Sequence, residues 1–249
     1  RRSFPICTPV FIEMSLLIYP DLSDRGPENM GTDWWMFSNS SQVQLPTFRA
    51  YSWESDEISF GYGQNWEWVE RVTGLPINNL MRRPTGGGIV RHGGDWTYCL
   101  TLPGDHPSFS IPSLRLYELI HEAIGLALAK QDVATSLQPC PACKPNGIPG
   151  DCFEEPVGKD LMTENGKVKL AGAAMKKSKK AVLVQGTIDL SSIPGFDAKS
   201  FKNDLVGALS DIVGEKAETV EWPESFLSER NIFAGEFASL EWRRERKRV

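Results

Sequence analysis

The chain has 249 residues and a formal net charge of -5, with 41% hydrophobic and 24% charged residues. These proportions are ordinary for a globular protein with a full-sized core, and the acidic balance argues against a general nucleic-acid binder. No apolar run approaches the roughly 20 residues of a membrane-spanning helix, so we expect no integral membrane protein. The five irregularly spaced cysteines do not form the pattern of a disulfide framework, which predicts a reducing, cytoplasmic setting.

The first half of the chain predicts two helices with an aromatic β-segment between them. Residues 28–37 carry apolar side chains at helical spacing. Residues 48–53 and 57–62 alternate aromatic or β-branched side chains with polar ones, which predicts a β-hairpin. Residues 112–132 form the clearest helix, and an irregular loop over 136–151 with four prolines and two glycines follows it. The apolar face of that helix comprises Leu114, Tyr117, Ile120, Ile124 and Leu128.

The second half predicts two paired strands followed by helices. Residues 167–175 and 181–190 form the predicted strands, joined by a lysine-rich turn. A helix begins at about Asp197, its expected N-cap, and ends near Gly214. The face that this helix buries comprises Phe201, Leu205, Leu209 and Ile212. Strands in the middle with helices around them predict an α+β fold, a mostly antiparallel sheet with flanking helices.

Two clusters concentrate positive charge in this acidic chain. Four lysines stand within residues 176–180, and five basic residues stand within 243–248. Such runs form solvated faces or tails in many proteins, and they can also dock an acidic protein partner. Both interpretations stay open from the sequence.

The most informative stretch is residues 81–92, which contains three consecutive glycines at 86–88. Glycines allow the backbone to approach a ligand closely and to adopt positive φ. Arg82 and Arg83, just upstream, can grip phosphate or carboxylate with a planar fork. The block is neither a phosphate-binding P-loop nor a dinucleotide G-x-G-x-x-G motif. A glycine-rich hairpin turn is the alternative interpretation.

The block Arg82-Arg83-x-Thr85-Gly86-Gly87-Gly88-x-Val90-x-His92 resembles the signature of the lipoate–protein ligase and octanoyltransferase superfamily, which is related to biotin–protein ligases. Further matches follow the family's order at 28–33, 49–64, 165–174 and 185–188. The resemblance implies a single biotin/lipoate ligase-like catalytic domain over 25–245, preceded by an N-terminal extension and first strand over 1–24. Lipoate ligases of this family usually add a C-terminal accessory domain, but only 59 residues follow Leu190, so we expect none here.

The resemblance assigns the family's motif lysine to Lys169, which directly precedes Leu170-Ala171-Gly172. In the family this lysine lies against the acyl carbonyl or acyl phosphate. A partly buried ammonium can stabilise the oxyanion of acyl transfer and favour the thiolate form of a neighbouring cysteine. Lys167 would share the strand face of Lys169, but the motif register selects Lys169.

Cys152 is the candidate nucleophile. A Cys-Phe pair about this far ahead of the lysine motif looks like the nucleophile loop of the ligase-like, cysteine-dependent octanoyltransferases, whereas ATP-dependent lipoate ligases generally lack that cysteine. A thiolate is a good nucleophile and leaving group, so a thioester intermediate needs no ATP. The open alternative is a small zinc site on Cys140, Cys143 and Cys152, with His121 or Asp151 as fourth ligand.

The resemblance also supplies the remaining site residues. His92 is expected at the acyl site as a wall and hydrogen-bond donor, and a satisfied core histidine is the alternative. The expected substrate-binding residues are Arg82, Arg83, Thr85, Gly86, Gly87, Gly88, His92, Gly172 and Ala173.

The implied activity is acyl transfer in protein lipoylation. An octanoyl or lipoyl group would pass from acyl-carrier protein, through a thioester on Cys152, to a lysine of the lipoyl domains of 2-oxoacid dehydrogenases or of the glycine cleavage H protein. We expect no cofactor and no nucleic-acid or membrane partner. The alternatives are an ATP- and Mg²⁺-dependent lipoate–protein ligase, a lipoyl amidotransferase, and a non-catalytic zinc-containing binding module.

Overall fold

The computed structural model describes residues 15–140, 150–213 and 216–247. Within these ranges nine strands form one large sheet. Along the sheet lie β12 (Lys216–Thr219), β1 (Ser15–Ile18), β3 (Thr47–Trp53), β7 (Asp95–Pro103), β11 (Ala181–Asp189), β10 (Lys169–Lys177), β9 (Leu161–Thr163) and β8 (Thr135–Leu137), with β2 (Leu22–Asp24) paired to β3. From β3 to β8 every neighbouring pair is antiparallel, whereas β1 runs parallel to β3 and β12. The predicted α+β class with a mostly antiparallel sheet is therefore confirmed.

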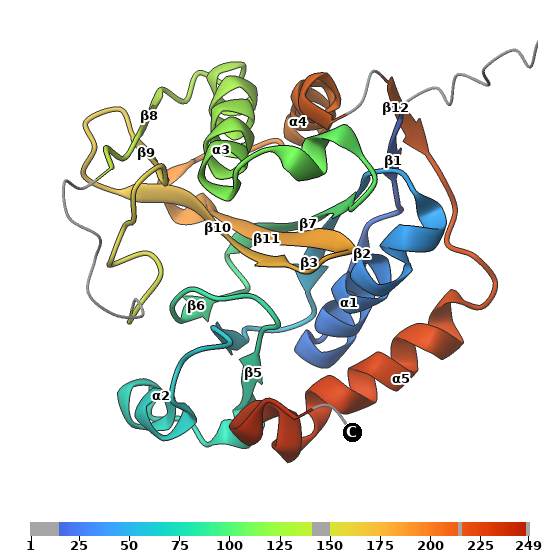
Figure 1. The fold of residues 1–249 in the computed structure, drawn as a ribbon. Coiled ribbons are helices and arrows are strands. Elements are labelled where there is room, and N and C mark those ends of the chain that lie inside the picture. The colour runs from blue at the N-terminus through green and yellow to red at the C-terminus, as the bar shows by residue number, and fades with distance from the viewer. Residues whose placement is uncertain (1–14, 141–149, 214–215, 248–249) are drawn as a thin grey trace, which may run out of the picture.

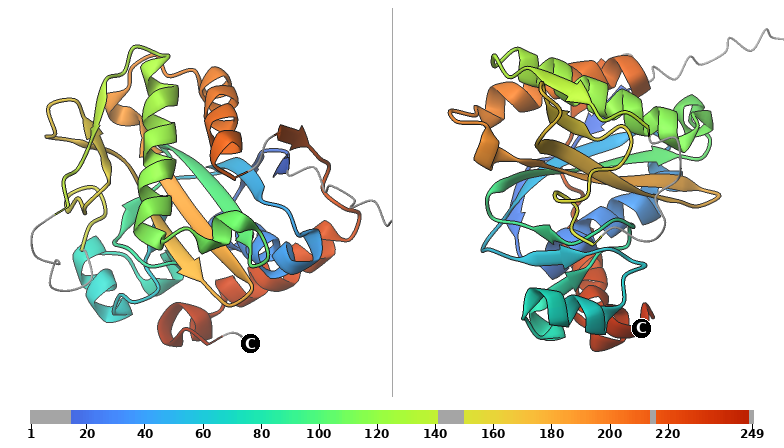
Figure 2. Two further views of the ribbon diagram at one scale, coloured as in Figure 1. Left: turned by 45° about the horizontal axis from the view of Figure 1, so that its top comes forward. Right: turned by 90° about the vertical axis from the view of Figure 1, so that its left-hand side faces the viewer.

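Helices cover both faces of the large sheet (Figures 1 and 2). On one face lie α3 (Ser113–Ala129) and α4 (Ala198–Val213); on the other lie α1 (Gly26–Val43) and α5 (Phe226–Ala238). A small sheet of β5 (Leu80–Arg82), β4 (Ile58–Phe60) and β6 (Val90–Arg91), with α2 (Trp66–Thr73), lies on the α1 side. Shorter helical turns are Ile77–Asn79, Pro107–Ser110, Leu190–Ser192 and the π-helical Glu241–Glu245. No helix in the described part of the chain is long and apolar enough to cross a bilayer.

The central strands separate two cores by alternation of their side chains. On β7, Tyr98 and Leu100 belong to the core under α3 and α4, whereas Cys99 between them belongs to the core under α1. On β11, Val184 belongs to the core under α3 and α4, and Leu183 belongs to the core under α1. The α1 face of these two strands also carries polar residues, and these polar residues lie at the site described below.

Several predicted elements are confirmed. The predicted strands 167–175 and 181–190 correspond to β10 and β11, which form an antiparallel hairpin. Asp197 caps α4, because its carboxylate accepts hydrogen bonds from the Lys199 and Ser200 amides at 3.0 and 3.1 Å. The helix predicted over 28–37 is part of the longer α1.

The predicted hairpin of 48–53 with 57–62 is wrong. β3 belongs to the large sheet, whereas β4 belongs to the small one and pairs with β5 and β6. All three residues of β4 are buried, so its faces and edges are already occupied within the small sheet. Alternation of polar and apolar residues predicts a strand but does not choose its partner.

Two smaller predictions also need correction. Leu114 does not belong to the apolar face of α3, since it is 57% exposed, and Leu116 takes the first buried position ahead of Ile120 and Ile124 at four-residue steps. The segment 136–151 is not wholly irregular, because β8 begins at Thr135 and pairs with β9. Residues 141–149 and Gly214 lie outside the described residues.

Candidate active site

Lys169 and Cys152 meet at the end of β10 that faces the small sheet. Lys169 is the first residue of β10 and is 4% exposed. Its Nζ donates to the Cys152 main-chain oxygen at 2.8 Å and lies 3.3 Å from Cys152 Sγ. Lys167 is exposed and precedes the strand, so the motif register identified the lysine that reaches the thiol.

The cysteine loop is held against the end of the glycine-rich segment. Cys152 N donates to Ile89 O at 2.9 Å, and Ile89 N donates to Gly150 O at 2.9 Å. A β-carbon at Gly88 would lie 2.9 Å from both Cys152 N and Gly150 O, so only glycine permits this approach. The glycine block thus sets the position of the cysteine.

A cavity with a mainly apolar surface lies beside the pair, and Cys152 contributes to its lining. One row of cross-strand neighbours contributes to its lining: Gly172, Thr187, Thr97 and Tyr51, on β10, β11, β7 and β3. Strands lie about 4.8 Å apart, so this row spans about 14 Å from the side of Lys169. Further lining residues are Met30, Trp53, Val90, Ala174 and Gln185. A pocket of mainly apolar side chains with a few polar groups suits a flexible acyl chain.

Arg83 and Arg82 point to different places. Arg83 lines the cavity, and its guanidinium donates to Ser59 Oγ, Gly86 O and Gly88 O at 2.7, 3.1 and 2.7 Å. Burial lowers the pKa of Arg83, and the nearby Cys152 acts in the opposite direction. No carboxylate in the described ranges forms an ion pair with it.

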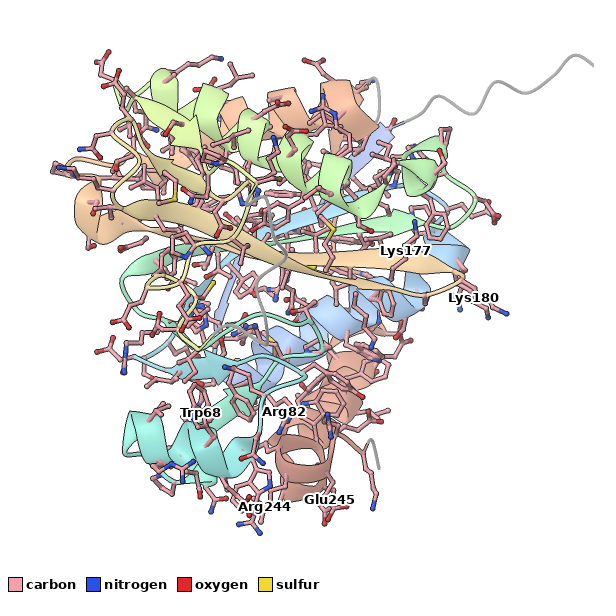
Figure 3. All side chains as sticks on the ribbon, turned by 60° about the vertical axis from the view of Figure 1, so that its left-hand side comes forward. Trp68, Arg82, Lys177, Lys180, Arg244 and Glu245 are labelled. Carbon is pink, nitrogen blue, oxygen red and sulfur yellow. The ribbon has the colours of Figure 1, made fainter. Side chains whose placement is uncertain are left out.

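Arg82 lies away from the cavity, between the small sheet and the C-terminal turn (Figure 3). Its guanidinium donates to main-chain oxygens of Arg243, Tyr62 and Gln64 at 2.7, 2.7 and 2.9 Å. Of the two arginines predicted to bind substrate, the structure brings only Arg83 to the cavity.

Thr85 holds the glycine loop to the sheet. Its hydroxyl is buried and donates to Gln185 Oε1 at 2.7 Å, while Gln185 Nε2 donates to Asp33 Oδ2 at 2.7 Å. Asp33 is in turn paired with the fully buried Arg49 at 2.7 Å. Gly87 lines the cavity with a φ of 86°, and Gly86 accepts from Arg83.

His92 is part of the cavity wall, where it stacks on Trp53 at 3.8 Å between ring centroids. Its Nδ1 lies 2.7 Å from Asp95 Oδ2, and its Nε2 lies 2.6 Å from Ser59 Oγ. Since Ser59 Oγ accepts from Arg83, its own proton points to Nε2, which assigns the ring proton to Nδ1. Burial lowers the pKa of His92, in keeping with this neutral ring.

Ser59, His92 and Asp95 have the order of a hydrolase triad but not its accessibility. Ser59 is 0% exposed, and its oxygen is held by Arg83. A nucleophile must reach its substrate, so these residues support the wall rather than form a second acyl-accepting site.

Gly172 and Ala173 follow the motif lysine along β10. Gly172 lines the cavity next to the Lys169 side chain, and Ala173 N donates to Tyr117 Oη at 3.2 Å. The same tyrosine hydroxyl bonds Asp160, which forms a buried ion pair with Lys169 at 2.8 Å. The sequence-based reasoning missed Tyr117 as a site residue and Asp160 altogether. The only available signal for Asp160 was an acidic residue directly before the apolar pair Leu161-Met162.

The candidate zinc ligands are only partly within the described ranges. Cys140 is exposed, Cys152 is half-buried beside Lys169, and Cys143 lies outside the described residues. His121 is buried on α3, with Nδ1 2.9 Å from Tyr117 O. Among the residues with described positions, no three His, Cys, Asp or Glu side chains cluster as metal ligands do.

Comparison with known proteins agrees with this geometry. The family model "Lipoyl protein ligase A/B catalytic domain" matches residues 25–228. Octanoyltransferase LipM of Brevibacillus brevis is 26% identical over 230 residues, covering 85% of this chain and 81% of that protein. LipM of Bacillus subtilis is 27% identical over 213 residues, covering 77% and 76%.

Solved structures share the fold. Lipoate-protein ligase A bound with ATP superposes with a TM-score of 0.70 at 19% identity, covering 93% of this chain and 98% of that one. The putative lipoate protein ligase of T. acidophilum gives a TM-score of 0.71 at 19% identity, covering 94% and 100%. The predicted lipoate ligase-like architecture is confirmed.

Proposed function

The chain belongs to the lipoyl protein ligase A/B catalytic-domain family, and from this premise we propose that it transfers an octanoyl group to a carrier-domain lysine through a thioester on Cys152. The observation that carries the proposal is the 3.3 Å separation of Lys169 Nζ and Cys152 Sγ beside a cavity with a mainly apolar surface. The octanoyltransferase relatives support the same reaction class.

In the first half-reaction the Cys152 thiolate attacks the carbonyl carbon of an acyl thioester. The new carbon–sulfur bond forms as the bond to the carrier's sulfur breaks, and the carrier leaves as its thiolate. Two cations flank the attacking sulfur, Lys169 at 3.3 Å and the buried guanidinium of Arg83. Both favour the thiolate, and Lys169 is also placed to stabilise the oxyanion.

In the second half-reaction a neutral lysine amine attacks the octanoyl thioester. An amide bond forms, the bond to Cys152 Sγ breaks, and the proton lost by the amine restores the Cys152 thiol. A thioester donor is already activated, so neither half-reaction requires ATP or another cofactor.

The donor in this proposal is octanoyl-acyl-carrier protein. The acceptors are lipoyl domains of 2-oxoacid dehydrogenases or the glycine cleavage H protein. Lys179 and Lys180 are exposed at the end of the β10–β11 hairpin, next to Lys177 (Figure 3). This positive turn can steer an acidic carrier toward the site. In the second basic cluster Arg243 is buried and donates to Asn78 O at 2.6 Å, whereas Arg244, Arg246 and Lys247 are exposed.

Two other functions share this architecture. An ATP-dependent lipoate ligase would need free acid, ATP and Mg²⁺, and an amidotransferase would take its acyl group from another carrier domain. The half-buried cysteine beside Lys169 favours thioester transfer over adenylation.

Intact-mass spectrometry tests the proposal. The protein is mixed with octanoyl-acyl-carrier protein without ATP, and we expect a gain of one octanoyl mass that hydroxylamine removes. Cys152→Ala should gain nothing, whereas Cys140→Ala, which alters an exposed thiol, should load like the unmodified protein. An adduct that persists in Cys152→Ala would refute the assignment. Loading that occurs only with free octanoate, ATP and Mg²⁺ would select the ligase.

A further inference from the structure

Asp160 is a buried carboxylate that is fully committed to hydrogen bonds. It is 0% exposed and directly precedes β9. Its Oδ2 accepts from Val157 N at 2.6 Å and lies 2.8 Å from Lys169 Nζ. Its Oδ1 accepts from the hydroxyl of Tyr117 on α3. Both oxygens of the carboxylate therefore have partners.

The Lys169 amino group has three acceptors around it. They are Asp160 Oδ2 at 2.8 Å, Cys152 O at 2.8 Å and Cys152 Sγ at 3.3 Å. An ammonium has three donor hydrogens and no acceptor, whereas a neutral amine has only two hydrogens. The observed contacts match an ammonium with one hydrogen directed at each acceptor.

Tyr117 fixes the far side of the carboxylate. Its hydroxyl accepts from Ala173 N at 3.2 Å and donates to Asp160 Oδ1. Burial first, and then the charge of Asp160, raise the pKa of Tyr117 well above 10, so the phenol keeps its proton. The main chain of β10 is thereby linked through Tyr117 and Asp160 back to Lys169 on the same strand.

We propose that Asp160 is the positioning residue of the Cys152 site, which retains the charge on Lys169 and aims it at the sulfur, and that Tyr117 holds Asp160 in place. The inference rests on the proposed function, in which Cys152 is the nucleophile. It also gives the 4% exposed Lys169 a partner, since removing one member of a buried ion pair leaves an uncompensated charge that is strongly destabilising.

The same arrangement serves both stages of acyl transfer. Before loading, the third Lys169 hydrogen stabilises the thiolate. Once the sulfur forms the thioester it is no longer anionic, and that hydrogen is free to bind the developing oxyanion. Asp160 and the Cys152 carbonyl keep Nζ in place throughout, so a single donor acts at sulfur and then at oxygen.

Within the described ranges, few other charged groups face this site. Arg83 faces Cys152 from the glycine block, and His121 on α3 faces Asp160 and Lys169. Burial lowers the pKa of His121 to about 4, and burial also lowers that of His92 on the cavity wall. An alkylation profile measured above neutral pH is therefore not complicated by protonation of either histidine.

The test is the pH profile of Cys152 alkylation by iodoacetamide, with modification assigned to the residue by fragment mass spectrometry. Asp160→Asn keeps the shape of the side chain but removes its charge. We expect the pH midpoint of Cys152 alkylation to rise, because Lys169 loses the partner that aims its ammonium at the sulfur. Tyr117→Phe should also raise the midpoint, but by less than Asp160→Asn does. An unchanged or lowered midpoint in Asp160→Asn would overturn the inference.

Asp24→Asn is the control for the loss of an ion pair away from the site. Asp24 on β2 pairs with Arg230 on α5 at 3.3 Å, and neither residue lines the cavity. This variant should leave the alkylation midpoint unchanged. If Asp24→Asn moved the midpoint as far as Asp160→Asn does, loosened folding would account for both, and Asp160 would have no positioning role.

Octanoyl loading separates this inference from the proposed function. Alkylation needs no acyl donor, so its profile can support the role of Asp160 even if Cys152 never accepts octanoate. Conversely, normal loading of Cys152 with an unchanged midpoint in Asp160→Asn would leave the function standing and remove only this inference. If Cys152 is the acyl acceptor and Asp160 positions Lys169, kcat for octanoyl loading should fall about tenfold or more in Asp160→Asn. KM should change little, because the binding surface for the donor is intact.

Discussion

A β-carbon added to Gly172 would lie 2.5 Å from Cε of Lys169 and 2.6 Å from its Nζ. The missing side chain at position 172 is therefore what gives Lys169 room to cross to Cys152. This gives a steric reason for a glycine that follows the motif lysine by three residues, and it links a sequence motif directly to the geometry of the thiol.

Gly172→Ala should displace the Lys169 ammonium and slow octanoyl loading of Cys152 by about tenfold or more. Gly207→Ala is the control, since position 207 is exposed on α4 with no atom near the added carbon. That control should load normally and gain about 0.5 kcal/mol of stability from reduced chain entropy. Rapid-quench mass spectrometry measures the rate of octanoyl loading of each variant. Equal rates for Gly172→Ala and the unmodified protein would contradict the steric argument.

The cavity predicts a limit on acyl length. Tyr51 ends the lining row that starts at Gly172, and its hydroxyl donates to Asp33 Oδ2 at 3.1 Å. Tyr51→Leu should open this end and raise the use of dodecanoyl relative to octanoyl donors in a competition assay read by mass. Tyr51→Phe keeps the ring and should retain the octanoyl preference. If both variants preferred octanoyl donors equally, Tyr51 would not be the residue that limits acyl length.

The hydrogen bond from Thr85 to Gln185 can be removed without changing the volume of the side chain, and its loss should lower stability. Thr85→Val leaves Gln185 Oε1 buried without its donor, which costs about 1–3 kcal/mol in the free energy of unfolding. Thr85→Ser keeps a hydroxyl and should recover most of that loss. Urea denaturation followed by tryptophan fluorescence provides the measurement. Identical midpoints for the valine and serine variants are incompatible with this anchoring role.

His121 predicts a loss of stability on acidification. Burial lowers its folded-state pKa from 6.5 to about 4, so the unfolded chain takes up the proton first as the pH falls. Stability should begin to fall near pH 6.5 and should stop falling, for this group, near pH 4. The loss amounts to a few kcal/mol at most. His121→Phe should show a flatter profile in urea denaturation across this range, and a profile parallel to the unmodified protein would count against the assignment.

How far the sequence predicts the site depends on the kind of signal. Helical period and strand alternation located α3, α4 and the β10–β11 hairpin, because these elements bury regular faces. Strand partners were harder: β3 and β4 are adjacent in the chain but join different sheets. Alternation contains no information about which edge a strand meets.

The site residues also divide into those that the sequence predicts and those that it does not. Motif order placed Lys169 and Cys152 together, and the structure agrees on their proximity. The motif treated Arg82 and Arg83 alike, yet consecutive residues leaving a strand point in opposite directions, so only Arg83 reaches the cavity. Asp160 escaped prediction because a single aspartate before a strand has no periodicity, and its importance lies in three contacts made on folding.

The proposed intermediate is an octanoyl group on Cys152, and a single-turnover chase follows that group to the acceptor. Octanoyl-loaded protein, freed of donor, is mixed with an unmodified lipoyl domain in the absence of ATP. We expect the domain to gain one octanoyl mass on its lysine while the protein loses the same mass. If the loaded protein kept its octanoyl group and the domain stayed unmodified, the thioester on Cys152 would not be an intermediate.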